Sequence, residues 1–299
     1  MANQQHLDAK ADWRFRATEN MDDTQFSNWL ALLEKRIGMA LPEQRKSFLL
    51  TALSVRMREL NINSYTDYYD LIKQGVSGNI EWEILVDRLT VHETRFFRDK
   101  QALELISSRY IKPILETETD YQFNIWSVGC ATGEEPYSLA MHIDNLLASV
   151  NSSAKFSITA VDVSNRSISV GREGVYSRTR LQGVSEEYLQ RYFEKLADGQ
   201  LRVCRSLRER VCFMRMNLLN TAQAPVSQMD IILCQNVLIY FKRERRIEVL
   251  NELAEHLKPG GILVLGAGEI LGWQHPAMQV FDTNGILSFQ RKRDQVVQQ

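Results

Sequence analysis

The fold is indicated by Asn124-Ile125-Trp126-Ser127-Val128-Gly129-Cys130-Ala131-Thr132-Gly133-Glu134-Glu135-Pro136-Tyr137-Ser138-Leu139-Ala140, an apolar run followed by two glycines and an acidic segment. The apolar residues suit a buried parallel strand, and the glycines let the backbone approach a ligand closely. Residues from Glu134 onward can open a helix. The order of strand, glycine turn and helix predicts a nucleoside-binding loop at the carboxyl end of a strand.

Two carboxylates at this turn restrict the ligand. A dinucleotide loop binds pyrophosphate through backbone N–H groups, and Glu134 and Glu135 would repel that anion. S-adenosylmethionine carries a sulfonium, an ammonium and a ribose diol, but no phosphate. The acidic turn therefore favours S-adenosylmethionine over NAD. The alternative is that both glutamates only complement the dipole of the helix.

Length, composition and charge limit the classes of protein. The chain has 299 residues, of which 44% are hydrophobic, so a sizeable buried core is expected. Its net charge of −1 provides no basic field that would recruit nucleic acid. The first residues lack the blocks of a secretion signal, and no apolar run is long enough to span a bilayer. We expect a cytoplasmic protein without direct membrane insertion.

Cysteine and histidine spacing argues against a metal centre. The cysteines form no Cys-x-x-Cys pair, and no histidine lies at metal-ligand spacing from a second ligand. Disulfides are also poorly supported, because the cysteines do not form a dense framework. We expect no metal and four reduced thiols, Cys130, Cys204, Cys212 and Cys234.

The hydrophobic pattern changes once along the chain. Residues 22–115 show helical spacing and predict an all-α domain, which follows an extension of residues 1–21. The acidic residues 116–120 are typical of a linker. In residues 121–299, predicted strands alternate with helices that follow Glu134, Ser164 and Lys242, and this order predicts an α/β domain with a mostly parallel sheet. The four predicted strands span residues 123–128, 156–163, 229–234 and 262–265.

Two further β segments are predicted in this second domain. Residues 201–203 and 211–213 flank a charged turn, so residues 199–213 are interpreted as a short hairpin. This hairpin would form a small β-subdomain inserted near residues 196–214. Residues 285–289 predict a last strand that pairs antiparallel with the rest of the sheet.

The helical domain carries a basic segment in an otherwise acidic protein. Arg45 and Arg56 are eleven residues apart, about three helical turns, so they share a face if the helix is continuous. Such a face is either simply solvated or a docking surface for an acidic partner. Six cations outnumber three acids in this segment: Lys35, Arg36, Arg45, Lys46, Arg56 and Arg58 against Glu34, Glu43 and Glu59.

The residues that could bind a ligand or take part in catalysis lie at the ends of the predicted strands or in a separate cluster. Because open α/β sheets bind ligands at the carboxyl ends of their strands, Asp162 is placed where its carboxylate can accept both ribose hydroxyls. Asp162 could instead cap the next helix. Residues 89–99 form a separate cluster, in which Arg98 offers a planar fork for a carboxylate. The alternative for Arg98 is a surface arginine beside Phe96 and Phe97.

These clusters together resemble the chemotaxis receptor methyltransferase family, CheR. The resemblance covers residues 26–289 and rests on four motifs: the segment around Phe96-Phe97-Arg98, the Gly129 turn, Asn217-Leu218-Leu219 and Cys234-Gln235-Asn236-Val237-Leu238-Ile239-Tyr240-Phe241. It implies a class I S-adenosylmethionine-dependent methyltransferase domain, Rossmann-like, with an N-terminal all-α domain and an inserted β-subdomain. The implied reaction transfers methyl from S-adenosylmethionine to glutamates in the cytoplasmic helical domain of chemoreceptors and releases S-adenosylhomocysteine.

The resemblance also implies roles for individual residues. Arg98 and Tyr240 are the implied catalytic residues, and Tyr240 would lie beside the transferred methyl. Arg45, Arg56 and Arg58 would dock an acidic receptor helix. The implied cofactor-binding residues are His92, Thr94, Arg98, Gly129, the glutamates of the Gly-Glu-Glu turn, chiefly Glu134, Asp162 for the ribose, Asn217, Leu218, Asn236 and Val237.

Two positions depart from the family pattern, and two other functions stay open. His92 stands where the family usually has asparagine, and Gln235 replaces an arginine. The short predicted hairpin favours docking without a receptor's carboxyl-terminal peptide. One alternative function is a methyltransferase for a small molecule or RNA, although the net acidity disfavours RNA. The other is a non-catalytic adaptor that keeps the fold to bind receptors or nucleotides.

Overall fold

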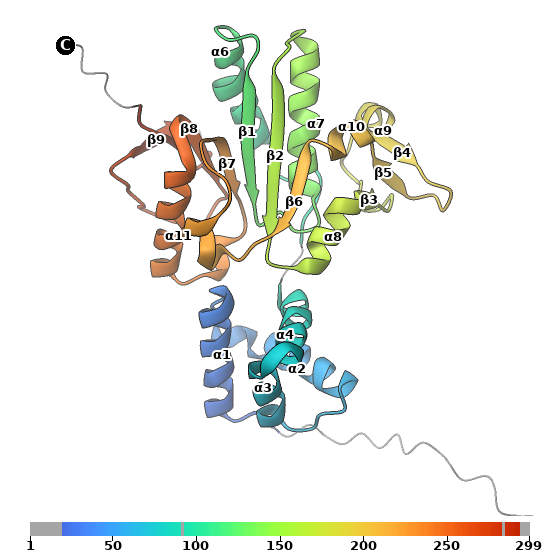
Figure 1. Cartoon of the computed structure of the whole chain (residues 1–299), viewed down its shortest axis with the longest axis vertical. Helices are drawn as coiled ribbons and strands as arrows, with labels where there is room; N and C mark the ends of the chain where they lie inside the picture. The colour runs from blue at the N-terminus through green and yellow to red at the C-terminus, as the bar shows by residue number, and fades with distance from the viewer. Residues whose placement is uncertain (1–19, 91–92, 283–284, 294–299) are drawn as a thin grey trace, which may run out of the picture.

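The computed structural model describes residues 20–90, 93–282 and 285–293, which form a helical domain and an α/β domain (Figure 1). In the helical domain, Asp22 caps α1 in a capping box with Gln25, and Gly38 ends it in the left-handed conformation. Leu33, Leu53 and their neighbours form a separate core. The helices are α1 (Asp23–Ile37), η1 (Glu43–Arg45), α2 (Lys46–Glu59), α3 (Tyr65–Lys73) and α4 (Gly75–Leu89).

The α/β domain is built on a seven-stranded sheet of order β6-β2-β1-β7-β8-β10-β9. Neighbouring strands from β6 to β8 are parallel, and β10 pairs antiparallel with β8 and β9. This arrangement is the class I methyltransferase fold. The strands are β1 (Gln122–Val128), β2 (Lys155–Asp162), β6 (Val211–Arg215), β7 (Met229–Cys234), β8 (Leu257–Leu265), β9 (Met278–Asp282) and β10 (Ser288–Arg291).

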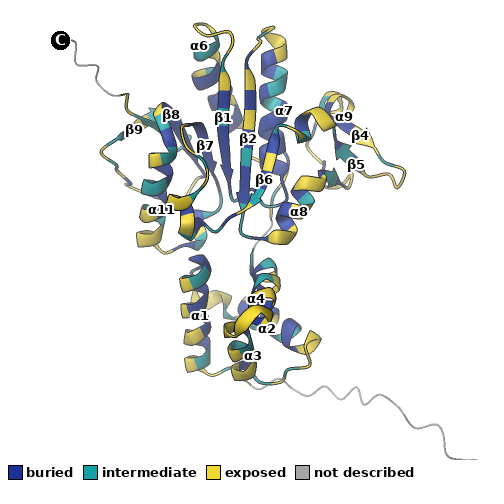
Figure 2. Ribbon diagram, in the orientation of Figure 1, coloured by how far each residue is buried: buried dark blue, intermediate teal, exposed yellow. Residues whose placement is uncertain are grey.

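Helices pack on both faces of this sheet, and the central strands β1 and β7 are mostly buried (Figure 2). Ile125 on β1 packs in one core with helices α5 and α7, whereas Trp126 packs on the opposite face against α11. Because successive side chains of a strand point to opposite faces, both neighbours are buried. The helices are α5 (Lys100–Leu105), η2 (Ile106–Ile111), α6 (Lys112–Leu115), α7 (Glu134–Ser149), α8 (Asn165–Glu173), η3 (Leu218–Gln223), η4 (Leu238–Tyr240) and α11 (Arg243–His256).

The predicted parallel strands are confirmed within a few residues, and so are the helices after Glu134, Ser164 and Lys242. The predicted last strand is confirmed as β10, which pairs antiparallel. All four cysteines are free. No helix within the described ranges is long and apolar enough to cross a membrane.

The predicted hairpin at residues 199–213 is wrong, because its two segments belong to different sheets. Residues 201–203 form β5 (Leu201–Val203), which pairs antiparallel with β3 (Val175–Tyr176) and β4 (Phe193–Lys195). Residues 211–213 belong to β6, which pairs with β2 at the edge of the main sheet. The inserted sheet therefore spans residues 175–203, with α9 (Glu186–Tyr192) inside it, and α10 (Arg205–Arg208) leads back to the main sheet. The expectation of tether-independent docking loses its basis.

The expected domain limit at residue 115 also needs correction. Residues 26–89 share the core of the helical domain. Leu103, Ile106 and Ile111, which we expected in that domain, instead pack in the core of the α/β domain with β1 and α7. Helical periodicity identifies these helices but carries no information on the core that they join, so the change of domain falls near residue 90.

The two domains meet at the carboxyl ends of β1 and β2 (Figure 1). The N–H of Ala40 donates to the carbonyl of Tyr240 at 2.7 Å, and Met39 forms a β-bridge with Phe241. A Cβ added to Gly38 would lie 2.3 Å from Phe241 Cε1, so the chain can pass this ring only with glycine at that position. The end of α1 is thereby attached to the edge of the sheet where ligands bind.

Candidate active site

Two adjoining pockets lie at the carboxyl ends of β1, β2 and β7. The interdomain pocket includes seven of the predicted site residues, and the loop pocket includes four. Both are lined by Gly129, Ala131 and Asn236, so they are neighbouring parts of one cleft. The predicted residues in the interdomain pocket are Gly129, Asp162, Asn217, Leu218, Asn236, Val237 and Tyr240; those in the loop pocket are Thr94, Arg98, Gly129 and Asn236.

Gly129 separates the two pockets and tolerates no side chain. Its φ of 73° lies in the left-handed region, and an added Cβ would meet Val237 Cγ2 at 2.1 Å. The backbone of the β1 turn therefore lies directly against the segment that follows β7. Gly129 also lines both pockets, so a ligand bound there would contact its main chain.

Asp162 holds the β1 turn and also lines the interdomain pocket. Its Oδ2 accepts the N–H of Ala131 at 2.9 Å, and its Oδ1 accepts the N–H of Ser164 at 2.9 Å. The carboxylate is half-buried, so it presents part of its surface to the pocket. A carboxylate can accept several hydrogen bonds at once, and a ribose diol offers two donors. The predicted ribose role remains a prediction with suitable geometry.

Asn217 joins the interdomain pocket to the helical domain. Its Nδ2 donates to the carbonyl of Arg36 at 2.6 Å, while its Oδ1 accepts the N–H of Leu219 at 3.0 Å and so caps η3. The side-chain amide therefore has partners on both ends. Leu218 is buried beside it and contributes apolar surface, as do Met39 and Met216. This end of the cleft suits a flat, apolar ring system.

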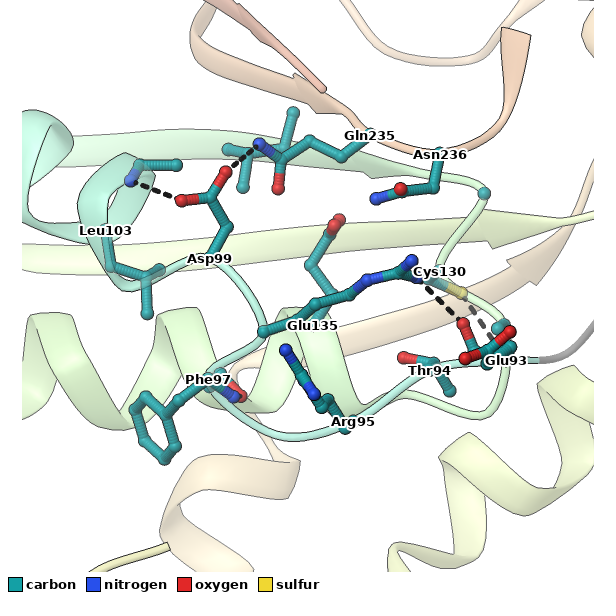
Figure 3. Close-up of a pocket in the computed structure, with 16 residues that line it drawn as sticks. Glu93, Thr94, Arg95, Phe97, Asp99, Leu103, Cys130, Glu135, Gln235 and Asn236 are labelled. Carbon is teal, nitrogen blue, oxygen red and sulfur yellow. Dashed lines mark hydrogen bonds between the residues drawn. The ribbon is translucent and has the colours of Figure 1, made fainter. Parts of the chain in front are cut away.

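The loop pocket is lined by the segment that connects the domains (Figure 3). Arg98 is exposed, and its Nη1 donates to the carbonyl of Glu93 at 2.9 Å. The N–H of Phe97, which has a left-handed φ of 52°, donates to Ser138 Oγ on α7 at 2.8 Å. Thr94 lies on the same segment. His92, predicted in this cluster, lies outside the described residues.

The two glutamates of the acidic turn have different environments. Glu134, to which the sequence reasoning gave the larger role, is fully buried and lines neither described pocket. Its Oε1 accepts from Arg180 Nη1 at 2.8 Å and its Oε2 from Thr132 Oγ1 at 2.7 Å. Glu134 is therefore paired with Arg180, and its role as the chief cofactor-binding carboxylate stays a prediction.

Glu135 is the carboxylate that lines the loop pocket. It accepts from Ser127 Oγ at 2.7 Å, and burial raises its pKa to about 7, although Ser127 and the charge of Arg98 act in the opposite direction. Carboxylates with raised pKa values in clefts are typical of functional sites. Residues 134 and 135 differ by about 100° around a helix, and this rotation alone decides which one faces the pocket.

Gln235 also lines the loop pocket and contacts Asp99. Its Nε2 donates to Asp99 Oδ2 at 3.0 Å, and Asp99 Oδ1 accepts the N–H of Ala102 to cap α5 (Figure 3). The side chain is buried, with 7% of its surface exposed. A neutral amide thus serves at the position where the family resemblance leads one to expect an arginine, and the charge of Asp99 stays uncompensated by this contact.

Tyr240 lies at the mouth of the interdomain pocket. It is half-buried, and the guanidinium of Arg45 lies 5.8 Å from the centre of its ring. This distance is within the range of a cation–π contact. Arg45 therefore brings a positive charge from the helical domain to the edge of the cleft, and its docking role stays a prediction.

Arg56 does not belong to an exposed docking surface. Its side chain is buried, its Nε donates to Glu81 Oε1 at 2.8 Å, and its other nitrogens bind Glu81 and Glu59. The hydroxyl of Tyr68 donates to the same Glu81 oxygen at 2.6 Å. The hydrogen bond with Glu81 is the main reason that the pKa of Arg56 is raised. Arg58, in contrast, is exposed.

Sequence reasoning missed Glu269, a fully buried carboxylate between β8 and β9. Its oxygens accept the N–H groups of Val237 and Ile239, both at 3.0 Å. A lone acid among the glycines at 266, 268 and 272 was the only local signal. Within the part of the chain that the structure describes, no group of three or more His, Cys, Asp or Glu side chains could hold a metal ion.

The fold and the cleft define a class I S-adenosylmethionine-dependent methyltransferase. Family models agree: residues 92–285 match "CheR methyltransferase, SAM binding domain" and residues 24–90 match "CheR methyltransferase, all-alpha domain". The chain belongs to the CheR methyltransferase family, and S-adenosylmethionine is its cofactor. The boundary between the two matches coincides with the change of core near residue 90.

Relatives that carry chemotaxis methyltransferase names match most of the chain. Chemotaxis protein methyltransferase Cher2 of Pseudomonas putida is 32% identical over 279 residues, which are 92% of this chain and 100% of the relative. Chemotaxis protein methyltransferase 1 of Pseudomonas aeruginosa is 33% identical over 83% of this chain and 91% of its own length. The chemotaxis protein methyltransferase of Vibrio parahaemolyticus is 33% identical over 84% and 90%, respectively.

Proposed function

We propose that this methyltransferase transfers the methyl group of S-adenosylmethionine to glutamate side chains in the cytoplasmic helical domain of chemoreceptors. The observation that carries the proposal is the cleft itself, in which an apolar pocket with a ribose-type carboxylate adjoins a charged pocket with Arg98 and Glu135. The names of the relatives support a chemotaxis role.

The two pockets match the two ends of the cofactor. Adenosine fits the interdomain pocket, where Leu218 and Met216 offer apolar surface and Asp162 offers oxygens for the ribose. The methionine part fits the loop pocket, where Glu135 can bind the ammonium group. Gly129 lines both pockets, so the chain of atoms between the two ends of the cofactor would pass along its backbone.

The proposed acceptor needs no general base. A glutamate has a reference pKa of about 4.3, so it is already ionised at neutral pH. One carboxylate oxygen attacks the sulfonium methyl, the carbon–sulfur bond breaks, and its electron pair stays on sulfur. The products are a γ-methyl ester and S-adenosylhomocysteine. Catalysis then consists of alignment and removal of water from the carboxylate, in which Arg98 holds the second oxygen and Tyr240 lies beside the methyl.

The helical domain offers the docking surface for the receptor helix. Arg45 and Arg58 are exposed, and Arg45 lies next to Tyr240, so an acidic helix bound there would reach the mouth of the cleft. Arg56 has no part in this surface, because its guanidinium is buried between Glu81 and Glu59.

Methyl transfer to a purified receptor tests the proposal. Tritium from labelled S-adenosylmethionine should enter the receptor and be released by mild alkali, as a methyl ester requires. Label that resists alkali, or label that enters RNA or a small molecule instead, would contradict the glutamate assignment. An absence of transfer to any acceptor, with intact cofactor binding, would favour a non-catalytic adaptor.

A further inference from the structure

The loops that follow β7 and β8 lie side by side, and the loop after β7 forms one wall of the cleft. The strand-end loop comprises residues 235–241, and the glycine loop comprises residues 266–272. Cys234 and Leu265 are register partners at the ends of the two strands, and the N–H of Gly266 still donates to the carbonyl of Cys234 at 3.3 Å. Beyond this point the ladder ends, so the backbone groups of both loops need other partners.

Glu269 provides partners for the N–H groups of the strand-end loop. One oxygen accepts from Val237 and the other from Ile239, and the side chain has no exposed surface. These bonds lie next to Asn236, whose φ of 60° is unusual for a residue other than glycine. The carboxylate therefore holds a sharp turn that would otherwise be strained.

Arg246 on α11 provides partners for the carbonyl groups of the same two loops. Its Nε donates to Phe241 at 2.8 Å, and its Nη2 donates to Ile239 at 3.1 Å, both in the strand-end loop. Its Nη1 donates to the carbonyl of Glu269 at 3.0 Å in the glycine loop. The planar guanidinium thus connects the loops in a way that a lysine could not reproduce.

We propose that Glu269 and Arg246 are positioning residues for the methyl-donor site. Neither touches the cleft in the pockets described above, but they bind opposite sides of the backbone that presents Asn236, Val237 and Tyr240 to it. Their removal would let the strand-end loop move away from Gly129. This proposal depends on the proposed function in one respect, the placement of the donor's adenosine in the interdomain pocket.

The direct test is Glu269→Gln, measured by calorimetric titration with S-adenosylhomocysteine. The amide replaces one acceptor oxygen with an NH2 group, which cannot accept from a backbone N–H. We expect affinity to fall on the order of ten- to hundredfold, because misplacement of the site by about 1 Å has effects of this size. Glu269→Asp keeps a carboxylate on a shorter side chain. Its affinity for S-adenosylhomocysteine should lie between that of the parent protein and that of Glu269→Gln.

Glu81→Gln is the matched control. Glu81 is also a buried carboxylate with several hydrogen bonds, but it lies in the core of the helical domain. We expect Glu81→Gln to lower the melting temperature while S-adenosylhomocysteine affinity stays within about twofold. Equal weakening of affinity in both variants, or unchanged affinity in folded Glu269→Gln, would overturn the proposal.

Arg246→Lys keeps the proposal testable if Glu269→Gln does not fold. Lysine keeps the positive charge but can donate to few of the carbonyls at once, so we expect a several-fold loss of S-adenosylhomocysteine affinity. Unchanged affinity would overturn the role of Arg246. Because this titration needs no receptor, failure of receptor methylation with intact titrations would contradict the proposed acceptor and leave the positioning role standing.

Discussion

Arg56 and Arg98 show how the same side chain serves two domains differently. In the helical domain, Arg56 is buried and binds Glu81 and Glu59, so its charge is used inside the core. At the domain junction, Arg98 is exposed at the loop pocket and is held by one backbone carbonyl of its own segment. An arginine available to a ligand is one whose carboxylate partner is not already supplied by the protein.

The largest expected effect is loss of catalysis in Arg98→Ala. If Arg98 holds the acceptor or the donor carboxylate, methyl transfer to a receptor should fall on the order of 10²- to 10³-fold, as for other lost charge-stabilising donors. The melting temperature should hardly change, because the side chain is exposed. Receptor methylation assays check the rate. Arg205→Ala, on the distant α10, is the control, and near-normal turnover by Arg98→Ala would remove Arg98 from the mechanism.

The opposite result is expected for Arg56→Ala. Removing one partner of a buried ion pair leaves Glu81 without its cation, which costs about 3–5 kcal/mol of unfolding free energy. Urea unfolding measures this loss. S-adenosylhomocysteine affinity of the folded protein should remain close to that of the parent, since Arg56 lies in the core of the helical domain. A stable Arg56→Ala protein with impaired receptor binding would restore the docking interpretation.

Donor affinity should depend on pH through Glu135. With a pKa raised to about 7, this carboxyl group is mostly protonated at pH 6 and mostly ionised at pH 8. Only the ionised form attracts the donor's ammonium, so S-adenosylhomocysteine should bind about tenfold more weakly at pH 6 than at pH 8. Calorimetric titrations across this range check the slope. Glu135→Gln should remove the dependence, and an unchanged slope in that variant would assign the titration to another group.

The smallest effect is expected from charge reversal of the docking surface. Arg45→Glu with Arg58→Glu should raise the KM for receptor several-fold at low salt, because exposed charges act through a screened field. S-adenosylhomocysteine binding serves as the internal control and should be unaffected by Arg58→Glu. A KM that does not respond to these changes or to salt would place receptor docking elsewhere on the molecule.

Strand positions could be predicted from sequence because each central strand is a short apolar run buried on both faces. Ile125 and Trp126 show this, since each belongs to a different core. The pairing of the strands was harder to predict from the sequence. The segment 211–213 pairs with β2, about fifty residues earlier, whereas the local pattern suggested the nearest β segment. Pairing depends on long-range packing that a local pattern does not contain.

The site residues that could be predicted from the sequence are those at the carboxyl ends of strands. Asp162 is the last residue of β2, Asn236 follows β7, and both line the cleft. The surroundings of a side chain were not predictable where its partner comes from elsewhere in the chain: Arg180 pairs with Glu134, and Glu81 pairs with Arg56. Glu269 was missed for a related reason, because its partners are backbone amides, which leave no trace in the identity of the residues that carry them.

The contact between Gly129 and Val237 has a consequence for sequence variation. These positions are separated by more than a hundred residues, yet a methyl group on one would occupy the space of a methyl group on the other. A library that randomises position 129 alone should yield only glycine among active clones. Randomising both positions should not recover alanine at 129 either, since its backbone φ of 73° strains any residue with a Cβ. The steric clash with Val237 and the backbone dihedral angle thus each require glycine at position 129.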